Sequence, residues 1–180
     1  MLSPVLPATA MTSWKPLSAA DRSTREDSPA ARREIANRLF FRLYQCANLM
    51  HKTGTRALEA HGVTTQQWAI LGALSRPGLD EGMAVGELVD YLKVSRQNLT
   101  GIVDRLEKLG FLQKARDPTD GRSRRVRLTG AGQDLWRDRL TPAIAAYYGE
   151  ATAGISTDDL IHACHYLNRL MDNFLDLEGR

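Results

Sequence analysis

The chain has little cysteine and no long apolar run, and both absences narrow what it can be. It contains two cysteines in 180 residues, Cys46 and Cys164, which gives no disulfide framework and fits the reducing cytoplasm. No apolar stretch approaches the roughly 20 residues that a membrane helix needs. The N-terminal residues have no basic segment followed by a long apolar one, so no secretory signal is expected. We therefore expect a cytoplasmic protein without a membrane partner.

The sequence also lacks the short motifs of common enzyme classes. It has no Gly-x-Ser-x-Gly motif, no phosphate-binding loop and no dinucleotide fingerprint. His162 and His165 share a helix face, but zinc needs further cysteine or carboxylate ligands that the neighbouring residues do not supply in a suitable position. We therefore expect no enzymatic activity, no catalytic residues, no metal site and no cofactor.

Net charge is small, but it is concentrated in one segment. The formal charge of the chain is +3, whereas residues 93–127 carry ten basic and four acidic side chains, a local charge of +6. The rest of the chain is therefore at −3. A basic block on a near-neutral protein is typical of a polyanion-binding face. Charge alone would fit a solvated loop and helix face equally well.

The order of periodic segments predicts a mainly helical fold with a small β-hairpin. Residues 1–30 are rich in Pro, Ser, Thr and Ala without lasting periodicity, which indicates a flexible arm. The hairpin is expected from FLQKA and RVRL, which alternate as strands do. A bend is expected at Pro142. The expected helices cover residues 31–60, 65–74, 85–92, 96–109, 129–148 and 156–175.

Two of these helices have the spacing of a helix-turn-helix. Their inward apolar positions are Leu88, Val89, Leu92, Leu99, Ile102, Val103 and Leu106. Polar residues remain on the outer face at the N-terminal end of the second helix, where a recognition helix meets base edges in the major groove. Gln and Asn suit adenine, Arg suits guanine, and Ser or Thr can contact phosphate. The predicted DNA contacts are Ser95, Arg96, Gln97, Asn98 and Thr100. A surface helix with polar residues is the alternative.

The sequence resembles MarR-family transcriptional regulators from about Arg38 to its end. The segments TTQQWAILGAL and DRLEKLGFLQKARDPTDGRSRRVRLTGAGQDL carry the resemblance. It implies a winged helix-turn-helix over residues 63–129 and a helical dimerisation domain from residues 31–62 and 130–176. It also implies a homodimer that binds a pseudo-palindromic operator in double-stranded DNA. The apolar residues of the first and last helices suit a dimer, but they would suit a monomeric core equally.

The stretch RDPTDGRSRRVRLT is the wing in this resemblance. The family's Asp-x-Arg unit falls on Asp120-Gly121-Arg122, which implies that Arg122 enters the minor groove and that Asp120 orients it. A narrow groove concentrates negative potential and favours a guanidinium, which agrees with this role. Arg124 and Arg125 alternate faces on the returning strand, so one can touch phosphate while the other faces away. Arg124 is included among the predicted DNA contacts. A calcium loop does not fit, because its carboxylates would be spaced differently.

An effector site is the third expectation from the resemblance, because members of the family often bind a small aromatic anion between the dimer helices and the DNA-binding lobe. The predicted effector-binding residues are Arg38, Tyr44, Asn48, His51 and Trp68. Rings together with Asn, His and Arg suit a phenolic ring with a carboxylate or thioester. The alternative is that these polar groups form interhelical hydrogen bonds at the dimer seam.

The run from residue 38 to residue 77 is similar to regulators of aromatic-acid and hydroxycinnamate catabolism. This similarity implies an aromatic carboxylate or its coenzyme A thioester, such as hydroxycinnamoyl-CoA, as the effector. The sequence thus predicts a MarR-type repressor that an aromatic effector releases from its operator. A ligand-independent winged-helix DNA-binding protein is the alternative.

Overall fold

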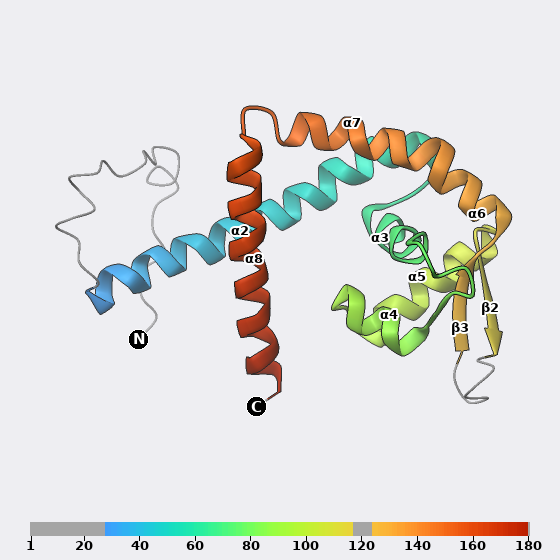
Figure 1. Ribbon diagram of the computed structural model, residues 1–180, viewed down its shortest axis with the longest axis horizontal. Helices are drawn as coiled ribbons and strands as arrows, with labels where there is room; N and C mark the ends of the chain where they lie inside the picture. Colours follow the sequence, from blue (N-terminus) through green and yellow to red (C-terminus); the bar gives the residue numbers. More distant parts are fainter. Residues whose placement is uncertain (1–27, 117–123, 180) are drawn as a thin grey trace. The chain divides into compact units, whose positions relative to one another are not determined.

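The computed structural model describes residues 28–116 and 124–179 (Figure 1). The chain divides into two compact units, residues 1–48 and 49–180. The mainly helical fold with a small sheet is confirmed. Its elements are α2 (Pro29–Leu58), η2 (Glu59–His61), α3 (Thr65–Leu74), β1 (Met83–Ala84), α4 (Val85–Leu92), α5 (Arg96–Lys108), β2 (Leu112–Arg116), β3 (Arg124–Leu128), α6 (Gly130–Asp134), η3 (Leu135–Leu140), α7 (Thr141–Ala151) and α8 (Thr157–Glu178).

The described part of the first unit is the N-terminal portion of α2. The helix begins where Ser28 accepts a hydrogen bond from the Ala31 amide (3.1 Å) and Pro29 takes the first helical position. The large apolar side chains of this portion are exposed, namely Ile35, Leu39, Phe40, Phe41 and Tyr44. In the second unit α2 continues through η2 and stops at Gly62, which has a φ of +67°. No helix among the described residues is long and apolar enough to span a bilayer.

The core of the second unit surrounds α3. Thr64 caps α3 by accepting from the Gln67 amide, and the Gln67 side chain accepts in return from the Thr64 amide (2.9 Å). Ile70, Leu71 and Leu74 are buried, and α3 packs on both α4 and α5. All seven apolar residues that the spacing places inward on α4 and α5 contribute to this core. Val89 and Leu92 pack against it partly buried, and the other five are buried, namely Leu88, Leu99, Ile102, Val103 and Leu106.

The wing contains a third strand that the sequence does not predict. The strand order is β1-β3-β2, and β1 pairs with β3 through Met83–Val126 and Ala84–Arg125. A two-residue strand is too short to produce an alternating pattern, which is why the sequence predicts only a hairpin. Gly82 makes the pairing possible: its φ is +78°, and a Cβ there would lie 2.3 Å from the Val126 carbonyl oxygen.

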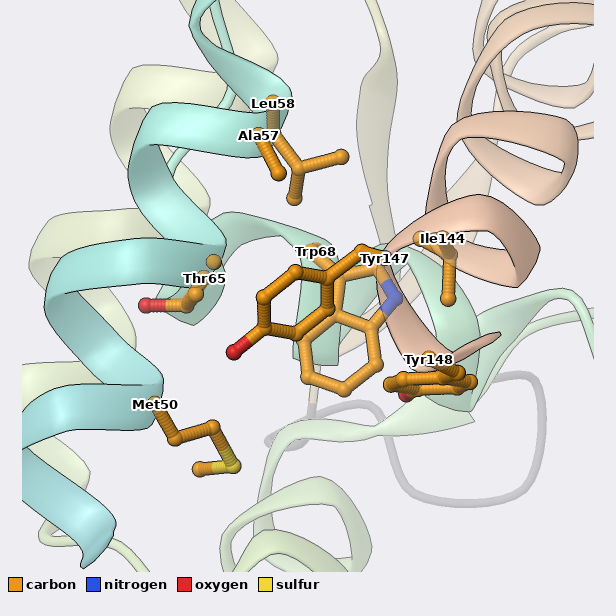
Figure 2. Close-up of a pocket in the computed structure, with 9 residues that line it drawn as sticks. Met50, Ala57, Leu58, Thr65, Trp68, Ile144, Tyr147 and Tyr148 are labelled. Atoms are coloured by element: carbon orange, nitrogen blue, oxygen red, sulfur yellow. The ribbon is translucent and has the colours of Figure 1, made fainter. Parts of the chain in front are cut away.

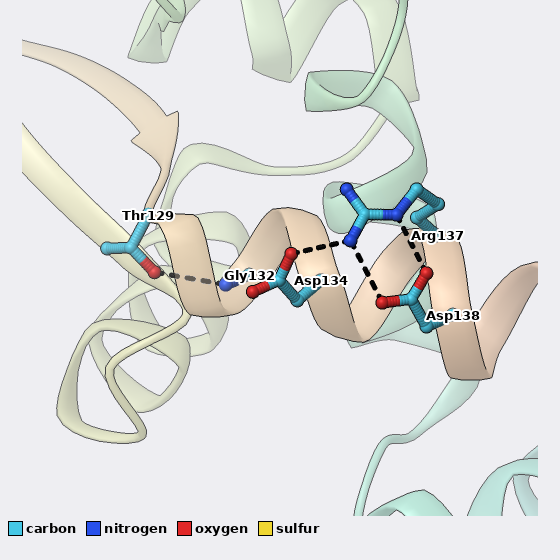
Figure 3. Close-up of polar contacts among 5 residues, drawn as sticks. All are labelled: Thr129, Gly132, Asp134, Arg137 and Asp138. Atoms are coloured by element: carbon cyan, nitrogen blue, oxygen red, sulfur yellow. Dashed lines mark hydrogen bonds and ion pairs between the residues drawn. The ribbon is translucent and has the colours of Figure 1, made fainter.

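The helix after the wing is widened rather than simply bent at Pro142. It starts at Thr129, whose hydroxyl accepts from the Gly132 amide (3.1 Å, Figure 3). A π-helical stretch, η3, then runs directly up to Thr141, the residue before the proline. Pro142 has no amide hydrogen for the carbonyl four residues earlier. The amide and the hydroxyl of Thr141 both bond instead to the Trp136 carbonyl, five residues back.

The last helix, α8, extends to Glu178, about one turn beyond the predicted end. The Ser156 hydroxyl accepts from the Asp159 amide (3.1 Å) and donates to the Asp159 carboxylate (2.6 Å). These bonds fix the start of the helix where the sequence places it. No residue of α8 is buried in the single chain.

Candidate nucleic-acid interface and apolar cleft

The outer face of α5 carries all five polar residues that the sequence predicts as DNA contacts, and all five are exposed. Two of their hydroxyls have local partners. Ser95 caps α5 by accepting from the Asn98 amide (3.3 Å), and Thr100 donates to the Arg96 carbonyl (2.8 Å). The structure places the side chains of Arg96, Gln97 and Asn98 against no described hydrogen-bond partner. Their donors and acceptors are therefore available to an incoming ligand.

Arg105 and Lys108 extend this face by one further turn, and neither is among the residues predicted from the sequence. Gln97, Gly101, Arg105 and Lys108 follow each other at helical spacing and are exposed. A Cβ at Gly101 would meet no atom within 4 Å, so the surface is open at that point. The sequence does contain a signal for them, because both are basic residues in phase with Gln97. The helix-turn-helix pattern predicts base contacts only in the first turns of the helix, and therefore does not identify these two residues.

The described part of the wing ends in a pair of arginines. Arg116 and Arg124 are direct cross-strand partners, and both are exposed. Like charges in such a pair repel each other, and a polyanion would relieve the repulsion. The predicted groove contacts Asp120 and Arg122 lie outside the described residues, so their roles stay predictions.

Arg125 behaves differently from its neighbour Arg124. Its guanidinium donates to the carbonyl of Gly82 (2.6 Å) and to that of Glu81 (3.3 Å). Arg125 therefore holds the loop before β1 against β3. This contact distinguishes the two arginines that the alternating pattern left unranked, and it leaves Arg124 as the residue available to contact a phosphate.

Lys114 fastens the wing to the recognition helix. Its ammonium group pairs with Asp104 and with Glu107 (2.8 Å), and its amide donates to Glu107 (3.2 Å). The hydrogen bond with Asp104, followed by that with Glu107, raises the pKa of Lys114, and the bond from Lys114 lowers the pKa of Asp104. One lysine thereby pairs with both acids of α5, and the three side chains together keep a formal charge of −1. Six exposed cations of this segment form no ion pair with a described residue, namely Lys93, Arg96, Arg105, Lys108, Arg116 and Arg124.

An apolar cleft lies between the end of α2, α3 and α7 (Figure 2). Its cavity volume is only about 20 Å³, room for about one water molecule, so a ligand ring would enter only if side chains moved. The lining contains one predicted effector residue, Trp68, and comes entirely from the second unit. The lining residues are Met50, Gly54, Ala57, Leu58, Thr65, Trp68, Ile144, Tyr147 and Tyr148.

The other predicted effector residues do not line this cleft. The Nδ1 atom of His51 forms a hydrogen bond with the Thr65 hydroxyl (2.9 Å), which is an interhelical bond of the kind that the alternative interpretation describes. Arg38, Tyr44 and Asn48 belong to the first unit, where all three are exposed and Arg38 pairs with Glu34. Their part in effector binding therefore stays a prediction.

Polar groups in the cleft are few, and two of its hydroxyls, those of Thr65 and Tyr147, are engaged in hydrogen bonds. The Tyr147 hydroxyl bonds to that of Thr53 (2.8 Å), and burial raises the pKa of Tyr148. The Trp68 Nε1 atom is buried without a hydrogen-bond partner among the described residues. Leaving such a donor unpaired costs about 1–3 kcal/mol. Tyr147 and Tyr148 were not predicted from the sequence, although two adjacent aromatic residues one turn after Pro142 were a visible signal.

Comparisons with known proteins point to one family. The model of the MarR family matches residues 61–123. The chain is 52% identical over 160 residues to the transcriptional activatory protein BadR of Rhodopseudomonas palustris, covering 89% of this chain and 91% of that protein. It is also 27% identical over 115 residues to the homoprotocatechuate degradative operon repressor of Escherichia coli, covering 63% of this chain and 74% of the repressor.

Solved structures agree with the fold. The PcaV transcriptional regulator of Streptomyces coelicolor, in complex with its natural ligand, superimposes with a TM-score of 0.62 at 27% identity over 87% of this chain and 98% of that one. Reduced AbfR bound to DNA has a TM-score of 0.67 at 21% identity over 82% of this chain and 99% of its own, which supports the fold alone. The relatives that are named as transcriptional regulators support the expectation that this chain is a regulator rather than an enzyme. The chain belongs to the MarR family of DNA-binding transcriptional regulators.

Proposed function

We propose that this regulator binds a pseudo-palindromic operator as a homodimer and changes its grip when a small aromatic effector enters the cleft. The effector is an aromatic carboxylate or a thioester of one. The observation that carries the proposal is that one compact unit holds both an exposed basic recognition helix and an aromatic-lined cleft, with α3 packed between them. A winged-helix protein that only binds DNA has no need of the second feature.

The DNA-facing part of the proposal consists of the outer face of α5 and the wing. Arg96, Gln97 and Asn98 read base edges, while Arg105 and Lys108 contact the phosphate backbone. On the wing, Arg124 contacts phosphate, and Arg122 enters the minor groove with Asp120 as its partner. This assignment is supported by the exposure of the described residues and by the absence of competing ion pairs within the described chain.

The homodimer is supported by apolar side chains that are exposed or half-buried in the single chain. On α8 these residues recur at alternating steps of four and three, a spacing typical of helices that pack against another helix. They are Leu160, Cys164, Leu167, Met171 and Phe174. Soluble monomers rarely expose a continuous apolar face of this kind. A second copy of the chain covers this face, with residues 31–62 and 130–176 as the dimerisation domain, 63–129 as the DNA-binding domain and 1–30 as an N-terminal arm.

Coupling between ligand and DNA runs through α3. Trp68 lies on the side of α3 that faces the cleft, whereas Ile70, Leu71 and Leu74 are buried in the core that α4 and α5 share. An aromatic ring that displaces Trp68 therefore shifts α3, and with it the core against which the recognition helix α5 packs. Allosteric coupling of about 1–3 kcal/mol would change operator affinity roughly 5- to 150-fold.

The protein can act either as a repressor or as an activator of its target genes. The sequence predicts repression relieved by the effector, and the similarity to a degradative operon repressor supports that sign. The stronger similarity to an activatory protein favours activation instead. The same ligand-dependent DNA binding serves either sign, depending on where the operator lies relative to the promoter.

One experiment tests the proposal even when the operator sequence is not known. DNA selected in vitro from a random pool would be titrated with the protein by fluorescence anisotropy, with and without benzoate, 4-hydroxycinnamate and their coenzyme A thioesters. We expect at least one ligand to change the affinity within the roughly 5- to 150-fold range. Tight, sequence-specific binding that none of these ligands changes would favour the ligand-independent alternative.

A further inference from the structure

Trp68 carries a buried hydrogen-bond donor that no described group satisfies. Among the side chains of residues 28–116 and 124–179, its Nε1 atom is the one buried nitrogen or oxygen without a partner. Two neighbouring hydroxyls are engaged, because that of Thr65 bonds to His51 and that of Tyr147 bonds to Thr53. Folded proteins seldom bury an unpaired donor unless a ligand or a water molecule completes it.

The donor faces other residues of the cleft. Figure 2 shows the nitrogen side of the Trp68 indole turned toward Ile144 and Tyr148, both of which line the cleft. The rings of Trp68 and Tyr148 meet edge to face, with centroids 6.2 Å apart. If a molecule that carries a hydrogen-bond acceptor binds among these three residues, its acceptor can lie next to the indole N–H.

The cleft offers a hydrogen bond but no positive charge. None of its lining residues is a Lys, Arg or His, and burial raises the pKa of Tyr148 and so keeps its phenol neutral. A carboxylate that enters loses its hydration and gains no cation in return, which is costly. An uncharged carbonyl loses far less hydration and gains the whole hydrogen bond.

We propose that Trp68 is a specificity-determining residue whose Nε1 donates to an uncharged oxygen of the effector. The cleft then favours an aromatic ketone, amide, ester or thioester over the free acid and over a hydrocarbon of the same shape. This inference rests on the proposed function, in which the cleft holds the effector. It narrows the effector class to compounds whose carbonyl is uncharged.

Three small probes of similar shape test this selectivity on the full-length protein. Acetophenone has a neutral acceptor, benzoate has a charged one and ethylbenzene has none. Isothermal titration should give acetophenone a roughly tenfold lower Kd than either of the others, as one well-formed hydrogen bond allows. Trp68→Phe removes the N–H and keeps a ring, so acetophenone and ethylbenzene should then bind alike. Trp136→Phe is the matched control, because Trp136 does not line the cleft.

A second measurement does not depend on how well the Trp68 variant folds. The chain has three tryptophans, Trp14, Trp68 and Trp136, so nitrogen-15 labelling gives three indole N–H signals. Trp14→Phe and Trp136→Phe identify two of them, and the third belongs to Trp68. Acetophenone should move the Trp68 proton signal downfield, and ethylbenzene should not.

The outcomes separate this inference from the proposed function. If benzoate binds as tightly as acetophenone, or if the acetophenone preference survives in Trp68→Phe, the role of Trp68 is wrong, although the cleft still binds aromatic molecules. An indole signal that acetophenone leaves unmoved has the same meaning. If none of the three probes binds and no aromatic compound changes operator affinity, both the inference and the proposed function fail.

Discussion

The outer face of α5 and the cleft beside α3 belong to the same compact unit and are built in opposite ways. The α5 face is exposed and cationic, and the side chains of Arg96, Gln97 and Asn98 bond to no described residue. The cleft is apolar and narrow, and the buried Trp68 N–H in it has no hydrogen-bond partner among the described residues. The first arrangement suits a large, hydrated polyanion, and the second suits a small molecule that arrives with its own acceptor. One folded unit can thus respond to two chemically different ligands.

Arg122→Ala should give the largest difference between the effect on operator binding and the effect on probe binding in the cleft. We expect operator affinity to fall roughly 5- to 150-fold, which is about 1–3 kcal/mol, because the variant loses the guanidinium expected in the minor groove. The slope of log K against log salt should decrease by about 0.9, the value of one phosphate contact. Probe binding in the cleft should be unchanged. Anisotropy titrations at several salt concentrations measure both effects, and equal affinity and slope in variant and parent would refute the wing assignment.

Two glycine substitutions sharpen the comparison, because they add the same methyl group to each region. A Cβ at Gly54 would lie 2.6 Å from the Thr65 Cγ2 atom, so Gly54→Ala forces α2 and α3 apart beside the cleft. We expect a loss of about 1–3 kcal/mol in unfolding free energy from overpacking. Binding of aromatic probes should be lost, while the folded protein should keep its operator affinity.

Gly101→Ala is the counterpart on the DNA face. The position is helical and open, so alanine should raise the unfolding free energy by about 0.5–1 kcal/mol. The new methyl group stands on the surface proposed to face DNA, and operator affinity should fall while probe binding stays intact. Thermal unfolding together with the two binding titrations checks both glycine variants. If Gly101→Ala keeps the operator affinity of the parent protein, the middle of α5 does not contact DNA.

Arg105→Ala tests the part of the α5 face that was not predicted from the sequence. If Arg105 contacts phosphate, its loss weakens specific and nonspecific DNA binding to a similar degree and lowers the salt slope by about 0.9. Gln97→Ala is the matched variant, because loss of a base contact should reduce the preference for the operator over other DNA and leave the slope alone. If Arg105→Ala leaves the salt slope unchanged, the interface ends in the first turns of α5.

The sequence predicts the two regions to very different extents, and the reason is physical. Helix spacing identifies Arg96, Gln97 and Asn98, because one helix with a buried stripe determines what its opposite face exposes. The cleft instead combines residues almost a hundred positions apart, such as Met50 and Tyr148, and only tertiary packing brings them together. Trp68 was recognised because it resembles a wall residue, but its unpaired N–H has no signature in the sequence. The pairing of His51 with Thr65 was equally hidden, because it crosses between two helices.

The smallest expected effect concerns Asp104, which joins the recognition helix to the wing through Lys114. The hydrogen bond from Lys114 lowers the folded-state pKa of Asp104, so the carboxylate stabilises the fold above its unfolded pKa of about 3.9. That contribution disappears as the pH falls through the lower folded value. Asp104→Asn should therefore show a shallower loss of stability than the parent protein as the pH falls below about 4. Urea unfolding at several pH values measures this difference, with Asp90→Asn, a substitution at an exposed residue of α4, as the control.

Because Asp104 lies at the surface, the expected change in stability is small. Identical stability profiles in acid for Asp104→Asn and the parent protein would mean that the Asp104–Lys114 pair does not hold the wing to α5. In that case the two regions would also differ in what stabilises them. Backbone pairing between strands would stabilise the DNA-binding face, and side-chain packing would stabilise the cleft.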